Sequence, residues 1–74
     1  MSAVYEIAKL LDMIKEEKSK CYEELEDLTY METFWKRYTY SKLICKGKIE
    51  ALIMIEKKLK EDLRKAVLIN EAEL

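Results

Sequence analysis

Apolar residues recur along the first part of the chain at alternating steps of three and four positions. This spacing follows the 3.6-residue period of an α-helix and places the apolar side chains on one helical face. The pattern predicts an amphipathic helix from about residue 2 to about residue 28. The line contains Val4, Ile7, Leu11, Ile14, Cys21, Leu25 and Leu28, and Lys18 alone interrupts it.

A second line of the same kind predicts a second helix from about residue 34 to about residue 70. It contains Tyr38, Cys45, Ile49, Leu52, Leu59, Leu63, Ala66 and Val67. The 74 residues include no proline and one glycine, so the chain lacks the turn residues that a many-stranded β fold requires. We therefore expect an all-α fold, in which two long helices form an antiparallel hairpin that makes a single domain over residues 1–74.

The turn between the two helices has more than one candidate position. The sequence Thr-Tyr-Met-Glu from Thr29 to Glu32 matches the capping box that often begins a helix, which favours a turn at about 29–33. A turn at 38–41, with Ser41 as the helix cap, is the alternative. A break at Gly47 would give three helices, but a glycine inside a helix costs only about 1 kcal/mol relative to alanine.

Charges are segregated around the expected turn. Residues 21–32 contain five acids and no base, whereas residues 33–48 contain five bases and no acid. This order opposes the helix dipoles, because acids end the first helix and bases begin the second. We expect the hairpin to place the two blocks side by side so that they neutralise each other. The alternative is that the basic block faces an acidic partner or a phosphate backbone.

Aromatic residues gather in the same region, where six of the seven lie between Tyr22 and Tyr40. Their interleaving with lysine and arginine is typical of hot spots in protein interfaces, and also of surfaces that stack on unpaired bases. A small aromatic core closing the hairpin is the structural alternative. The predicted partner-binding residues are Trp35, Lys36, Arg37, Tyr38, Tyr40, Lys42 and Lys46.

The second helix carries a further apolar line, beside or opposite the first. One hairpin partner cannot cover both faces, so a second helix should pack there. Gly47 and Ala51 form a small-xxx-small pair that permits close approach of helices, although this signal is weak outside membranes. We expect a homodimer of two hairpins forming a four-helix bundle, with docking on another protein as the alternative. The predicted interface contains Leu43, Ile44, Gly47, Ala51 and Met54.

The composition argues against catalysis. The chain has no histidine, which excludes Ser/His and Cys/His catalytic pairs and histidine-ligated metals, and it has no glycine-rich phosphate loop. We expect no enzymatic activity, no cofactor and no metal. Cys21 and Cys45 lie outside any CxxC motif and are expected to be buried, reduced thiols.

No membrane or export segment is expected. The longest apolar run, residues 51–55, is far shorter than the roughly 20 residues that span a bilayer. The first residues lack the basic and apolar segments of a secretory signal. These features predict a cytoplasmic protein.

The predicted function is that of a small non-enzymatic protein–protein interaction module. It would be a regulator, inhibitor or adaptor of bacterial or phage type that binds and occludes a partner's surface. One alternative is a helical-hairpin dimer that binds RNA or single-stranded nucleic acid, against which the net charge of −1 argues. The other is a structural coiled-coil assembly subunit.

Overall fold

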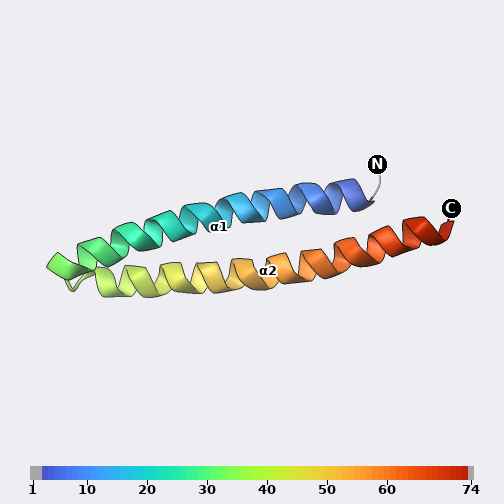
Figure 1. Cartoon of the computed structure of the whole chain (residues 1–74). Coiled ribbons are helices and arrows are strands. Elements are labelled where there is room, and N and C mark those ends of the chain that lie inside the picture. Colours follow the sequence, from blue (N-terminus) through green and yellow to red (C-terminus); the bar gives the residue numbers. More distant parts are fainter. Residues whose placement is uncertain (1–2, 74) are drawn as a thin grey trace.

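Two long helices make up the molecule. The computed structural model describes residues 3–73, with side chains described over residues 3–69. Helix α1 covers Ala3–Phe34 and helix α2 covers Tyr38–Glu73. They lie antiparallel and side by side, so that the start of α1 and the end of α2 are together at the end away from the turn (Figure 1). The predicted all-α hairpin is therefore confirmed, while its predicted start at position 2 lies outside the described residues.

The two predicted apolar lines form the core along the contact between the helices. Leu11, Cys21, Cys45 and Ile49 are buried. The last three form one cluster, and Leu25, Leu28 and Leu52 pack against it. The other members of both lines are half-buried, apart from the exposed Val67. The helical spacing thus predicted the apolar core residues, with the exception of Val67.

Charged residues complete both lines. Lys18 and Glu32 on α1, and Lys42 and Glu56 on α2, occupy the positions at which the three-and-four spacing would otherwise break. All four are half-buried or buried. With them, each helix has an unbroken seven-residue repeat, which is the pattern of a coiled coil. We call the members of the two repeats core positions; they are 4, 7, 11, 14, 18, 21, 25, 28 and 32 on α1, and 38, 42, 45, 49, 52, 56, 59, 63 and 66 on α2.

The turn lies at residues 35–37, so the prediction of a turn at 29–33 is wrong. Thr29 and Thr33 lie inside α1, where their hydroxyls donate to the carbonyls of Leu25 (2.7 Å) and Thr29 (3.2 Å). A threonine that bonds back to the carbonyl four residues earlier lies in the interior of a helix and does not cap a new one. Helix α1 continues because Glu32 is itself a core position, which a pattern built only from apolar residues does not include.

The two other candidate breaks also lie within a helix. Ser41 and Gly47 are both inside α2, which agrees with the prediction that the helix continues through the glycine. The turn is held by backbone bonds from Tyr38 to the carbonyl of Trp35 (3.1 Å) and from Thr39 to that of Lys36 (3.0 Å). No described residue has a positive φ, so the turn needs neither glycine nor proline. Neither helix, over the described residues, is long and apolar enough to cross a membrane.

Candidate interaction surface

The aromatic residues near the turn are exposed. Trp35 is 57% exposed and Tyr40 is 72% exposed. Tyr30 and Phe34 are also exposed, and their rings meet edge to face with centroids 5.3 Å apart. These side chains therefore do not form a closed aromatic core. We call Tyr30, Phe34, Trp35 and Tyr40 the aromatic tip of the hairpin.

Basic side chains lie beside the aromatic tip. The guanidinium carbon of Arg37 lies 5.4 Å from the ring centroid of Trp35 and 5.2 Å from that of Tyr38. These are distances at which a cation is attracted to an aromatic face, so Arg37 makes a cation–π contact with each ring. Lys36 and Lys46 are exposed, and Tyr38 is half-buried at a core position.

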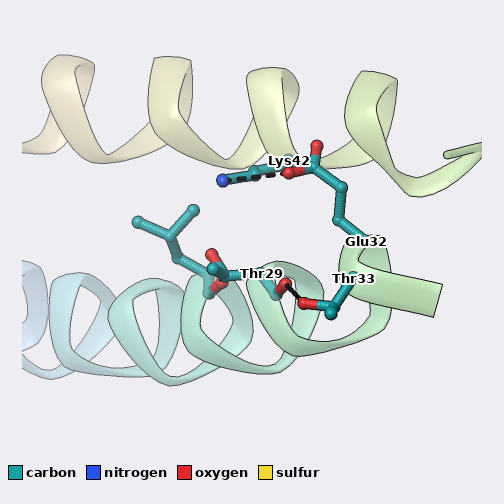
Figure 2. A network of polar contacts seen from close by, with 5 residues as sticks. Thr29, Glu32, Thr33 and Lys42 are labelled. Carbon is teal, nitrogen blue, oxygen red and sulfur yellow. Dashed lines mark hydrogen bonds and ion pairs between the residues drawn. The ribbon is translucent and has the colours of Figure 1, made fainter. Parts of the chain in front are cut away.

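Lys42 differs from the other predicted binding residues because it is engaged within the hairpin. Its ammonium group donates to Glu32 across the two helices at 3.2 Å, as Figure 2 shows. Hydrogen bonds from Thr39 and Lys42 lower the pKa of Glu32. Lys42 thus fixes the end of α1 to the start of α2 and is not free for a partner.

The acidic and basic blocks neutralise each other only in part. They lie on neighbouring ends of the two helices, as expected, but Glu32 and Lys42 form the direct ion pair between them among the described residues. The other four bases of the block, at positions 36, 37, 46 and 48, are exposed. A basic surface therefore remains next to the aromatic tip.

A second interhelical ion pair lies near the middle of the hairpin. Lys18 donates to Glu56 from the opposite helix, and Lys60 donates to the same carboxylate at 2.9 Å. Glu56 is only 7% exposed. Hydrogen bonds from Lys18 and Lys60 lower its pKa from 4.5 to about 2. This pair occupies core positions on both helices, so its role is structural.

Because the ion pairs of Glu56 are lost when its carboxylate is protonated, the hairpin is expected to be less stable in acid. Because the pKa of Glu56 is lower in the folded chain, its contribution to stability is complete above about pH 4.5 and is lost as the pH falls toward about 2. Thermal unfolding followed by circular dichroism should show Tm falling over that range. The Glu56→Gln variant should have a lower Tm at neutral pH and a smaller acid-induced fall. An equal fall in both proteins would exclude Glu56 as a main source of the acid sensitivity.

The two cysteines are free and buried. The Cys45 thiol donates to the backbone carbonyl of Cys21 at 3.2 Å. Burial is the main cause that raises the pKa of Cys45, and the nearby Glu24 raises it further. The raised pKa keeps the Cys45 thiol protonated and unreactive. Because both cysteines are buried, they serve as small core side chains, as predicted.

One side of the hairpin is formed by the residues that directly precede the core positions. A shallow groove on this side is lined by Glu17 and Cys21 of α1 and by Lys48, Ala51 and Leu52 of α2. Residues 17 and 48 precede core positions 18 and 49, so helical spacing places the other preceding residues on the same side. We call it the Ile44 face. Its exposed large apolar members include Leu10, Met13, Met31, Ile44 and Ile55.

The predicted dimer residues all lie on the exposed surface of α2. Ile44 and Ala51 belong to the Ile44 face, and Gly47 and Met54 continue it around the outer surface of α2. Leu43 follows core position 42, so it lies about 100° away from Ile44 on the helix. A Cβ atom built on Gly47 would meet nothing within 4 Å, so no contact within the hairpin requires a glycine there.

Two exposed surfaces with large apolar side chains therefore stand out among the described residues, namely the aromatic tip with its adjacent bases and the Ile44 face. Tyr30 and Phe34 were absent from the predicted binding residues, although their spacing of four positions would place them together on a helix that continues past residue 33. Comparison of the chain with protein-family models, with curated proteins and with solved structures finds no match.

Proposed function

We propose that this protein is a non-enzymatic protein–protein interaction module, which acts as a regulator, inhibitor or adaptor. It binds a partner protein through the aromatic tip and the adjacent Lys36, Arg37 and Lys46, and it occludes the surface to which it binds. Two copies associate through their uncovered apolar surface into a four-helix bundle.

The exposure of the aromatic tip carries this proposal. Four large aromatic side chains at one end of the hairpin are each more than half exposed, although burying such side chains is strongly favourable. Exposed apolar patches bordered by polar residues mark interaction sites, and Trp, Tyr and Arg dominate the energetics of protein interfaces. The neighbouring bases suit a partner surface that combines apolar and acidic groups.

The acids near the tip favour a protein partner over a nucleic acid. Glu26 and Asp27 border the same surface depression as Tyr30 and Met31. Carboxylates beside a stacking aromatic repel a phosphate backbone, whose neutralisation by lysine and arginine provides most non-specific affinity. The ion pair with Glu32 also leaves Lys42 unavailable for neutralising phosphates.

The surface area supports association of two copies. The chain exposes 6053 Å², whereas a compact monomer of 8.9 kDa is expected to expose about 4,800 Å². The difference exceeds the roughly 800 Å² that each partner buries in a standard interface. An isolated hairpin of two helices therefore leaves more surface uncovered than a compact monomer of its mass would.

A capture experiment tests whether the aromatic tip and its adjacent bases bind a partner protein. Immobilised wild-type protein and a Trp35→Ala/Arg37→Glu variant are incubated with nuclease-treated lysate of the source cell, and retained proteins are compared quantitatively. The variant should retain at least about tenfold less of the partner than the wild type, which is the loss expected when hot-spot residues are truncated. A Tyr22→Ala/Arg64→Glu variant, which makes the same kinds of change away from the tip, should retain it.

Two results would contradict the proposal. Equal capture by the wild type and the tip variant would exclude the tip as the binding surface. Partners that disappear after nuclease treatment, together with salt-dependent binding of mixed RNA, would favour the nucleic-acid alternative.

A further inference from the structure

The charges on the Ile44 face differ in sign between the two helices. The residues that precede core positions of α1 include the acids Glu6, Glu17, Glu24 and Asp27 and the single base Lys20, a net charge of −3. Within helix α2 itself, which begins at Tyr38 and so excludes Arg37 of the turn, they include the bases Lys48, Lys58 and Lys65 and the single acid Asp62, a net charge of +2. One edge of the face is therefore acidic and the other is basic.

A two-fold dimer through this face has two possible arrangements. With the turns at opposite ends, each helix packs on its own copy, so that the −3 edge meets the −3 edge and the +2 edge meets the +2 edge. With the turns at the same end, α1 of each copy packs on α2 of the other, and each acidic edge meets a basic edge. Like charges in apposition cost several kcal/mol in an interface, so the charge pattern selects the second arrangement.

We infer that two copies of this chain pair through their Ile44 faces with both turns at the same end. This inference rests on the proposed self-association and specifies its geometry. Each of the four helices then has antiparallel neighbours, as in an up-down four-helix bundle. Ala51, a small exposed residue of the Ile44 face, lets a helix of the second copy approach closely.

The opposite side of the hairpin fits a second copy less well. There, the residues that follow core positions carry two acids and one base on α1, and four bases and one acid on α2. A dimer through that side would leave an excess of positive charge in its interface. The Ile44 face comes closer to balance, at −3 against +2.

The arrangement has a consequence for partner binding. Both aromatic tips lie at one end of the dimer and form a doubled surface, whereas turns at opposite ends would separate the tips by nearly the 60 Å length of the hairpin. A partner would then meet two copies of Trp35 and Arg37 at once, which raises avidity without any new contact.

Charge reversal tests which edges meet. Glu24→Lys places a base opposite Lys48 of the second copy and should weaken dimerisation at least about tenfold, as measured by sedimentation equilibrium. In the other arrangement the acidic edges of the two copies meet, and the reversal changes each edge from −3 to −1, so repulsion falls and dimerisation should become tighter. Glu23→Lys, the same change one position away on the outer surface, is the matched control and should have little effect. Far-ultraviolet circular dichroism confirms that each variant remains helical.

Distances between the two copies provide the second readout. A spin label on Lys36→Cys should report a short distance between the two turns. A dimer of one copy labelled at 36 and one labelled through Lys9→Cys should report a long distance, about 40 Å for a separation of 27 positions, most of them within α1.

The reverse order of distances would overturn the inference and leave the proposed dimer intact. A monomer at all concentrations would overturn both the inference and the dimer, while the capture experiment with the tip variant would still decide the partner-binding proposal.

Discussion

Replacing Ile49 with alanine is expected to lower the free energy of unfolding by about 2–4 kcal/mol, within the range for truncating a buried isoleucine. Ile49 is 5% exposed and belongs to a cluster of buried residues, together with Cys21 and Cys45. A domain of this size rarely has more than about 3–5 kcal/mol of stability from its core. Urea unfolding followed by circular dichroism should therefore show a strongly lowered midpoint, or a chain already largely unfolded.

Ile53 provides the matched control for this prediction. It lies one turn further along α2 and is 43% exposed, on the side away from the Ile44 face. Ile53→Ala removes the same atoms and should change the free energy of unfolding by less than about 1 kcal/mol, because it leaves no internal cavity. Equal losses in the two variants would mean that the core does not lie where the structure places it.

Replacing both Lys18 and Glu56 with leucine is expected to raise the Tm of the hairpin by several degrees. The two charges occupy core positions between helices, and well-packed apolar residues in place of a buried ion pair are often more stable. The double substitution would also remove the paired charges that fix the alignment of the two helices. A purely apolar contact between helices accepts shifted registers more readily than one with paired charges. Thermal unfolding measures the first effect, and the disulfide cross-linking pattern of cysteine pairs placed across the two helices measures the second.

The single variants separate the ion pair from simple burial. Glu56→Leu alone leaves Lys18 half-buried without its carboxylate, and should lower the Tm even though it adds an apolar side chain. The exchanged pair Lys18→Glu/Glu56→Lys should recover much of the loss. A single variant more stable than the wild type would show that the pair contributes little to the hairpin.

The apolar repeat was sufficient to predict the two helices and their contacting faces, because burial of an apolar line at helical spacing decides both. The apolar repeat did not predict the turn. Charged residues are not part of an apolar line, so Lys18 interrupts it and Glu32 fits a helix cap, whereas both are core positions whose partners lie on the other helix. Their pairing depends on residues 38 and 10 positions away in the sequence, which local periodicity does not detect.

The candidate interaction surface was predicted only in part, because it also depends on where the turn lies and on how the two helices align. A turn at 29–33 would have separated Tyr30 from Phe34, while the longer α1 brings them together beside Trp35. The sequence places Lys42 in the basic block, and only the alignment of the two helices shows that it forms an ion pair with Glu32. The exposure of Trp35 and Tyr40, in contrast, follows from having more aromatic residues than one helical face can bury.

A single hairpin leaves an apolar face uncovered, and we propose that a second copy covers it. Sedimentation equilibrium of the wild-type chain over a wide range of concentrations tests this most directly. We predict that the apparent mass rises with concentration from 8.9 kDa toward twice that value. A mass of 8.9 kDa at every concentration would contradict the account.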